Sequence, residues 1–241
     1  MGYNLTIDQG NSSAKIAIHD GNRIVEAQRI ESLDAETVGH LLDRFCLDAA
    51  IYSSVSASGK DVVSALENRG IRTITLSPDT PLPIAIDYKT PTTLGRDRIA
   101  VAVGAFTEHP GCNMLVVDAG TAVTYDVVTA NGHYLGGNIA PGIDMRLSAL
   151  HAYTERLPLV DTNGDIPLWG YDTATAIRTG AMRGIVAEIA YYRSHLGDNA
   201  LVMLTGGNSD ELARLADFHV EVDTHLVNKG LNSILLYNES K

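Results

Sequence analysis

The chain has few of the residues that mark several common classes of protein. Its 241 residues include two cysteines, one tryptophan and three phenylalanines, and 18 lysines and arginines are outnumbered by 29 aspartates and glutamates. Two cysteines in a chain of this length do not form a disulfide framework, and neither Cys46 nor Cys112 has a cysteine or histidine at metal-ligand spacing. We therefore expect both cysteines in the core or at its boundary, in a protein of a reducing compartment.

Long apolar runs and excess positive charge are missing as well. The apolar stretch Ile99–Phe106 is far shorter than the ~20 residues that cross a bilayer, and the first residues lack the basic-then-apolar pattern of a signal peptide. A net charge of −11 argues against a protein that coats nucleic acid or anionic lipid. We expect a cytoplasmic protein with no nucleic acid and no membrane as partner.

Two familiar phosphate-binding motifs are also absent. Ser58-Gly59-Lys60-Asp61 lacks the upstream glycine and the following hydroxyl of a P-loop, and no Gly-x-Gly-x-x-Gly follows a strand. The eight histidines show no spacing typical of a zinc site. These absences remove the P-loop, dinucleotide-binding and structural-zinc interpretations.

What the sequence does contain is a plan that occurs twice. Three alternating segments, Tyr3–Ile7, Ser13–Asp20 and Arg23–Arg29, open the first half, and Asp20-Gly21 between them predicts a hairpin. The second half opens in the same way. Its predicted strands are Met114–Asp118, Ala122–Val128 and Tyr134–Ile139, with a turn at Asn131-Gly132.

Each meander is followed by alternating helices and strands. Helices are expected at 35–45, 60–69, 96–108, 145–153, 174–195, 209–216 and 229–237, and strands at 49–53, 72–76, 200–204 and 219–223. The passage from Pro78 to Pro91 has too many prolines for regular structure. This pattern predicts two similar α/β domains around one cleft, with a boundary at Pro110-Gly111; the alternative is one doubly wound sheet with added hairpins.

A short polar loop follows the first strand of each half. In Asp8-Gln9-Gly10-Asn11-Ser12 and in Asp118-Ala119-Gly120-Thr121, a carboxylate can hold a cation and glycine lets main-chain N–H groups approach an anion. Lys15 can reach phosphate oxygens as a point charge. Either loop alone is simply a hairpin turn, but two at equivalent points of a doubled plan favour a nucleotide triphosphate held by both.

A third segment, Leu94-Gly95-Arg96-Asp97-Arg98, lies where the proline-rich passage enters a helix. Asp97 can accept a proton from an attacking hydroxyl while Arg98 neutralises an anionic substrate. The same residues also fit a capping aspartate between two surface arginines. Gly-rich turns at 136–142 and 206–207 would let a flat purine or a ribose approach the backbone.

In combination these residues resemble the type III pantothenate kinase family, part of the acetate and sugar kinase, Hsp70 and actin superfamily. The matching segments occur in the family's order: Asp8 to Ser12 with Lys15, Tyr88 with Pro91 and Leu94 to Arg98, Asp118 to Ala122, and Gly136 to Gly142. As a set they are specific, and they cover the chain from Asp8 to about Gly207.

The resemblance implies an α/β fold of two similar ribonuclease H-like domains around a central nucleotide cleft. Residues 1–110 would form an N-terminal and residues 111–241 a C-terminal actin-like ATPase-type domain. It implies ATP-dependent phosphorylation of the terminal hydroxyl of pantothenate, the first step of coenzyme A biosynthesis, with Asp97 as general base. It also implies a homodimer whose pantothenate pocket is completed across the interface.

The resemblance further assigns individual contacts. The residues implied to bind pantothenate are Tyr88, Gly95, Arg96, Asp97, Arg98 and Thr173. Those implied to bind ATP are Asp8, Gln9, Gly10, Asn11, Ser12, Ser13, Ala14, Lys15 and Thr121. Asp118 would bind a monovalent cation, K⁺ or NH₄⁺, and Asp8 would bind Mg²⁺ through water.

Three positions depart from the family's usual pattern. Ser12 stands where threonine is common, Thr90 where an asparagine often precedes the proline, and Asp172 where an asparagine usually precedes the threonine. The change at Ser12 keeps the hydroxyl. The changes at Thr90 and Asp172 bear on the substrate contacts of Tyr88 and Thr173.

Two other functions fit the same residues. One is a kinase for a sugar or another small alcohol, because a fold does not determine the substrate. The other is a non-catalytic nucleotide-binding regulator, which the charge of −11 and the lack of a basic stripe disfavour as a direct DNA binder. The Gly-x-Asp-Arg segment after a proline-rich loop favours pantothenate over other acceptors.

Overall fold

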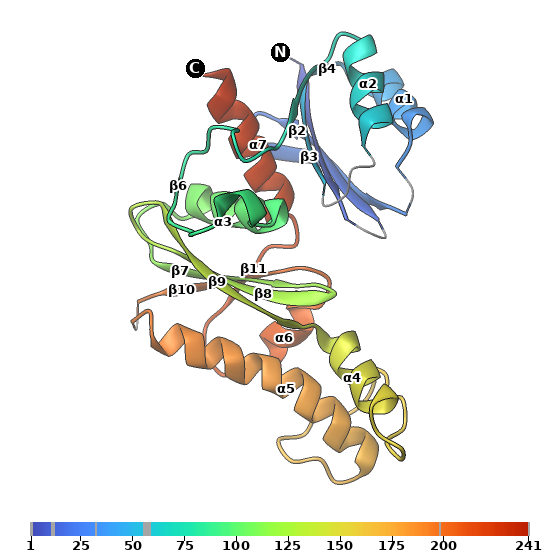
Figure 1. Cartoon of the computed structure of the whole chain (residues 1–241), viewed down its shortest axis with the longest axis vertical. Coiled ribbons are helices and arrows are strands. Elements are labelled where there is room, and N and C mark those ends of the chain that lie inside the picture. The colour runs from blue at the N-terminus through green and yellow to red at the C-terminus, as the bar shows by residue number, and fades with distance from the viewer. Residues whose placement is uncertain (1, 11–12, 32, 55–58, 198, 241) are drawn as a thin grey trace. The chain divides into compact units, whose positions relative to one another are not determined.

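The computed structural model describes residues 2–10, 13–31, 33–54, 59–197 and 199–240, and its chain divides into two compact units (Figure 1). The first unit comprises Met1–Pro110, Gly132–Tyr134 and His225–Lys241, and the second comprises Gly111–Asn131 and Leu135–Thr224. The chain therefore first passes from one unit to the other at the predicted Pro110-Gly111 boundary. Residues 225–241 differ from the predicted division at residue 110, because they pack with the first unit.

In the described residues of the first unit, a five-stranded sheet in the order β3-β2-β1-β4-β5 is accompanied by four α-helices. Its elements are β1 (Tyr3–Gln9), β2 (Ala14–Asp20), β3 (Arg23–Ile30), α1 (Ala35–Arg44), β4 (Leu47–Ser54), α2 (Lys60–Asn68), β5 (Arg72–Thr75), β6 (Ala85–Ile86), the 3-10 helix η1 (Pro91–Thr93), α3 (Arg96–Glu108) and α7 (Leu226–Glu239). The proline-rich passage contains only the short β6 and η1. β6 pairs in parallel with His133 and Tyr134, which belong to this unit.

Alternation along the strands separates two faces of this sheet. Leu5 and Ile7 point to an apolar core that includes Val38 of α1 and Leu66 of α2. Asn4 and Thr6 therefore point to the opposite face, where both bond to α7.

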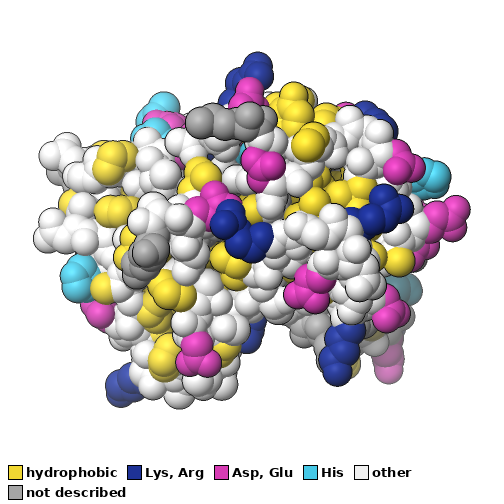
Figure 2. All heavy atoms as spheres, turned by 90° about the horizontal axis from the view of Figure 1, so that it is seen from above, with side chains coloured by type: hydrophobic (Ala, Val, Ile, Leu, Met, Phe, Trp, Pro, Cys, Tyr) yellow, Lys and Arg dark blue, Asp and Glu magenta, His cyan; other side chains and the backbone are white. Residues whose placement is uncertain are grey.

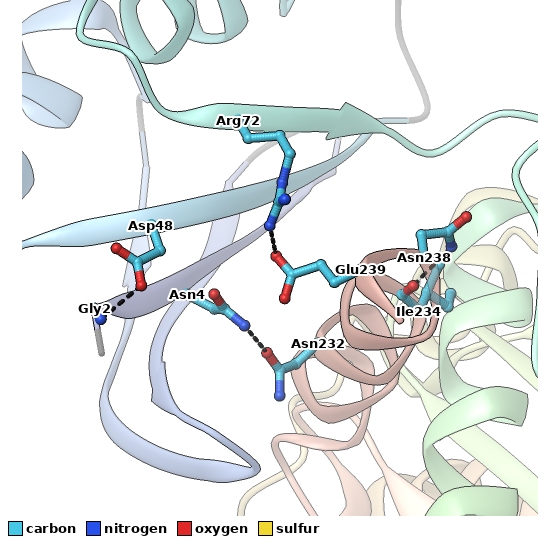
Figure 3. Close-up of polar contacts among 8 residues, drawn as sticks. All are labelled: Gly2, Asn4, Asp48, Arg72, Asn232, Ile234, Asn238 and Glu239. Carbon is cyan, nitrogen blue, oxygen red and sulfur yellow. Dashed lines mark hydrogen bonds and ion pairs between the residues drawn. The ribbon is translucent and has the colours of Figure 1, made fainter. Parts of the chain in front are cut away.

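Helix α7 is held in the first unit by apolar and polar contacts. Its residues Leu226, Leu231 and Leu235 are fully buried. The Asn4 amide donates to Asn232 at 3.3 Å, and Arg72 of β5 pairs with Glu239 (Figure 3). These contacts explain why the end of the chain lies with its beginning.

The second unit repeats the plan. Its elements are β7 (Met114–Ala119), β8 (Ala122–Val128), β9 (His133–Pro141), α4 (Ile143–Ala152), α5 (Thr173–Ser194), β10 (Leu201–Thr205), α6 (Ser209–Leu215) and β11 (Glu221–Val222). Among the described residues the sheet has six strands in the order β11-β10-β7-β8-β9-β6, in which β6 pairs with the first two residues of β9. Its first five strands correspond to β5-β4-β1-β2-β3 of the first sheet. In both sheets the first strand of the meander pairs antiparallel with the strand that follows it, β2 or β8, and parallel with β4 or β10 on its other side. A further parallel strand, β5 or β11, follows at that edge. The doubled plan is confirmed, and the single-sheet alternative is wrong.

The surface of the described residues adds three plain findings. None of their helices is long and apolar enough to cross a membrane. Both cysteines are free, and Cys46 is exposed, so its predicted place in or beside the core is wrong. On the face shown in Figure 2, lysine and arginine side chains lie apart from one another, among acidic and uncharged ones.

Candidate functional site

The first phosphate loop joins β1 to β2. Asp8 and Lys15 are cross-strand partners in the antiparallel register, so their side chains leave the same face of the hairpin. The Gly10 N–H donates to the Ser13 carbonyl at 2.9 Å, and the Ser53 hydroxyl of β4 lies 3.4 Å from Asp8 Oδ1. The structure thus places Asp8 and Lys15 opposite each other on one face of the hairpin. Asn11 and Ser12 lie outside the described residues.

A buried polar cluster joins the strands of this hairpin to α7. His19 Nε2 lies 3.1 Å from Thr6 Oγ1, which also accepts from Asn228 of α7 at 2.9 Å. The Asn228 amide approaches the main-chain carbonyl of Lys15 at 3.4 Å. Burial, with a smaller contribution from His225, lowers the pKa of His19 to about 4, so the ring is neutral at pH 7.

The second phosphate loop joins β7 to β8. Asp118 pairs in register with Thr124 of β8 on one side and with Thr205 of β10 on the other, so the three side chains share one face of the sheet. Thr124 Oγ1 and Thr205 Oγ1 are buried and have no hydrogen-bond partner among the described residues. A carboxylate between two such hydroxyls is a set of hard oxygen donors, which fits a monovalent or divalent cation.

Two glycines allow close approach to this loop. A Cβ on Gly206 would lie 2.4 Å from Asp118 Oδ1, and φ of Gly206 is +91°. A Cβ on Gly142 would lie 2.3 Å from the Gly120 carbonyl oxygen and 2.4 Å from that of Thr121. Both Gly-rich turns singled out in the sequence therefore lie directly against the second phosphate loop.

The Asp97 segment begins α3. Asp97 lies in the first turn, where its Oδ1 accepts from the Arg98 N–H at 2.9 Å. Arg98 is buried, and its guanidinium carbon lies 5.9 Å from the Tyr88 ring centre and 6.0 Å from that of Tyr134. The structure thus brings Tyr88 and Arg98 together. Tyr134, whose ring also lies beside Arg98, is a residue that the sequence analysis did not identify.

Arg96 takes a different direction from Arg98. Its Nε–H donates to the Leu76 carbonyl at 2.8 Å, and its side chain lines a cavity of about 560 Å³ together with Tyr52, Lys60 and Ser64. The two arginines of the segment therefore have different surroundings, although only Asp97 separates them in the sequence.

Thr173 is the exposed first residue of α5, and Asp172 caps that helix. Asp172 Oδ1 accepts from the Thr175 N–H at 2.8 Å, and this bond lowers the pKa of Asp172. Aspartate and asparagine both serve as N-caps, so the departure at Asp172 preserves the helix start beside Thr173. Thr90 is the residue before η1, and its hydroxyl accepts from the Thr93 hydroxyl at 2.8 Å.

Within the described ranges, no group of three His, Cys, Asp or Glu side chains is placed to hold a metal ion. Asp8 and Asp118 are instead single carboxylates with hydroxyls beside them.

Comparison with known proteins decides the family. The model of the type III pantothenate kinase family matches residues 4–195, which include both phosphate loops and the Asp97 segment. The chain belongs to this family. The type III pantothenate kinase of Phocaeicola vulgatus is 43% identical over 239 residues, covering 98% of this chain and 99% of the relative.

Solved structures confirm the fold of this type III pantothenate kinase family member. A conserved putative Baf family transcriptional activator from Campylobacter jejuni has a TM-score of 0.66 at 24% identity, covering 98% of this chain and all of that one. A ROK hexokinase from Thermus thermophilus has a TM-score of 0.53 at 14% identity, with 99% and 100% covered. These likenesses confirm the predicted fold of two ribonuclease H-like domains of the actin and sugar kinase type.

Proposed function

We propose that the chain transfers the γ-phosphoryl group of ATP to the terminal hydroxyl of pantothenate, giving 4'-phosphopantothenate, the first step of coenzyme A biosynthesis. The observation that carries the proposal is the family match over residues 4–195, which contains every predicted catalytic and binding residue. The geometry within each unit supports it, because Asp8 and Lys15 are cross-strand partners at the first loop and two glycines lie close against the second loop.

The nucleotide is proposed to contact both phosphate loops. In the first loop the paired Asp8 and Lys15 are suited to a metal-bound phosphate, since Lys15 can neutralise phosphate oxygens as a point charge. In the second loop the exposed Thr121 presents its hydroxyl and main chain. The proposed ATP contacts are Asp8, Gln9, Gly10, Asn11, Ser12, Ser13, Ala14, Lys15 and Thr121.

Pantothenate is proposed to bind at Tyr88, Gly95, Arg96, Asp97, Arg98 and Thr173. Asp97 would accept the proton of the terminal hydroxyl as its oxygen forms a bond to the γ-phosphorus and the bond to ADP breaks. Arg98, buried beside the Tyr88 and Tyr134 rings, would neutralise an anionic acceptor.

Two cations are proposed beside ATP. Mg²⁺, bound through water at Asp8, would neutralise charge on the β- and γ-phosphate oxygens, and K⁺ or NH₄⁺ would bind at Asp118. The buried hydroxyls of Thr124 and Thr205 beside Asp118 support a cation there. We further propose that the enzyme is a cytoplasmic homodimer.

The test is a coupled ADP-release assay with Mg-ATP and pantothenate, with and without K⁺. We expect turnover that requires pantothenate and K⁺, and a kcat lower by about 10²–10⁴-fold in Asp97→Asn, because the amide cannot accept the proton. Asp79→Asn, an exposed aspartate outside the site, is the matched control.

Near-wild-type turnover of Asp97→Asn would contradict the general-base role while leaving the reaction in place. Folded protein that releases no ADP with pantothenate would contradict the proposed acceptor, and a panel of small alcohols and sugars would then identify another.

A further inference from the structure

An ion pair joins α4 to α5 in the second unit. Arg146 Nη2 lies 2.9 Å from Glu188 Oε1 and 2.7 Å from Oε2, and the Arg146 side chain is only 18% exposed. Neither residue belongs to the proposed ATP or pantothenate contacts. Two partly buried charges in this place need a reason beyond stability, since such a pair contributes little net free energy.

A buried tyrosine completes the cluster. The Tyr125 hydroxyl of β8 donates to Glu188, while its ring lies 5.0 Å from that of Tyr192. Burial, the Glu188 hydrogen bond and the Glu188 charge raise the pKa of Tyr125. Burial alone would raise the pKa of Glu188, but the bonds from Arg146 and Tyr125 bring it below its ordinary value. Glu188 is therefore a charged acceptor for both partners.

The other side of Arg146 reaches the Gly-rich turn. Its Nε–H donates to the Pro141 carbonyl at 2.8 Å, at the last residue of β9. The next residue, Gly142, donates its N–H to the Thr121 carbonyl at 3.0 Å. One guanidinium thus connects Glu188 on α5 with the backbone that lies on the second phosphate loop.

Helix α5 has a glycine, Gly184, at the point where the Arg146 guanidinium lies against it. A Cβ on Gly184 would lie 3.3 Å from Arg146 Nη1, so glycine leaves the space that the arginine occupies. The planar fork can bond Pro141 and Glu188 together, which the point charge of a lysine cannot do.

We propose that Arg146, held by Glu188, which in turn accepts from Tyr125, is a positioning residue that sets the place of Gly142 and, through it, of Thr121 against the ATP phosphates. The proposal rests on the proposed function only in that Thr121 contacts the nucleotide. A purely structural ion pair would stabilise the unit without affecting nucleotide affinity.

The deciding variant is the double replacement Arg146→Met with Glu188→Gln. It removes both charges and keeps an oxygen acceptor for the buried Tyr125 hydroxyl, so the melting temperature is expected to stay within a few degrees of wild type. We expect the Kd for Mg-ATP, measured by calorimetry without acceptor, and the KM for ATP to rise at least about tenfold. The KM for pantothenate is expected to change less than about twofold.

Two comparisons sharpen the test. Arg146→Lys keeps the charge beside Glu188 but loses the bond to Pro141, so it should also weaken ATP binding. The matched control replaces Arg44 and Glu26, a two-bonded pair of the first unit, with methionine and glutamine, and it should leave ATP affinity unchanged.

A double variant that binds Mg-ATP like wild type overturns the proposal, whatever its melting temperature. If the double variant does not fold, unchanged ATP affinity in Arg146→Lys overturns the proposal, and a tenfold loss in that folded variant supports it. Wild-type protein that binds Mg-ATP but does not phosphorylate pantothenate would contradict the proposed acceptor, while the variants would still test the positioning role.

Discussion

His19 illustrates what a single buried residue does in this protein. Its ring contacts the Thr6 hydroxyl, which accepts from Asn228 of α7, and it is fully buried. A protonated ring there would be a poorly solvated charge, which is why the folded pKa is about 4 rather than the ordinary 6.5.

This shift predicts a loss of stability in mild acid. Between pH 6.5 and about 4 the unfolded chain binds a proton at His19 that the folded chain does not, so the free energy of unfolding falls as the pH decreases through that window. From pH 7.5 to pH 5.0 we expect His19 to contribute a loss of about 2 kcal/mol, measured by urea unfolding.

His19→Gln should remove that part of the pH dependence, since the amide does not titrate, whereas His40→Gln at an exposed position should leave it in place. An unchanged pH slope in His19→Gln would contradict the prediction.

The residues of the candidate site were predicted unevenly. Asp8, Lys15 and Asp118 were recognisable because a carboxylate beside glycine at a strand end is a local pattern. Tyr134 and Thr205 were not, because their places beside Arg98 and Asp118 depend on strand register and on packing between distant segments. The one feature of the sequence that could have indicated Thr205 as a site residue is its place at the end of a strand expected to lie parallel to β7.

At the scale of elements, hairpins were predicted well and the contact of α7 with α3 was not. Gly21 and Gly132 adopt positive φ at the predicted turns, which is a local requirement. In the α3–α7 contact, by comparison, a Cβ on Gly230 would lie 1.8 Å from the Ala100 carbonyl oxygen. The two helices pack backbone to backbone although 100 residues and more separate them in sequence.

This close contact makes Gly230 essential to the first unit. We expect Gly230→Ala to lower the free energy of unfolding by at least about 2 kcal/mol, because the clash is with main chain that cannot rotate away. Gly39→Ala is the matched control, since Gly39 lies in α1 with nothing within 4 Å of its would-be Cβ. That control should be neutral or stabilising by up to about 1 kcal/mol. Equal urea midpoints for Gly230→Ala and wild type would contradict the close packing.

At the scale of the whole molecule, the second unit presents large apolar side chains to solvent. Tyr153 is 89% exposed, Trp169 82% and Leu168 66%. Large exposed apolar groups that lie together mark interaction surfaces. Since Leu168 and Trp169 come within five residues of Thr173 of the proposed pantothenate site, they support the proposed homodimer.

The dimer predicts a mass in solution of twice 25.8 kDa at micromolar concentration, measured by sedimentation. Replacing Leu168 and Trp169 with serine should raise the dimer dissociation constant at least about tenfold, because large apolar residues dominate interface energy. Val25→Ser, a change at an exposed apolar residue of β3, should leave the mass unchanged. A wild-type mass of 25.8 kDa would contradict the proposal.

The amino-acid sequence alone determined the doubled β-meander, the two phosphate loops and the Asp97 segment. Each depends on residues within one turn or one hairpin, where glycine, carboxylate and alternating apolar positions act locally. Only the tertiary structure decided that the last helix belongs to the first unit, that Thr124 and Thr205 flank Asp118, and that Arg146 connects α5 to the Gly-rich turn. These contacts join segments far apart in sequence, and the register of strands and the packing of buried side chains select them, which no local pattern encodes.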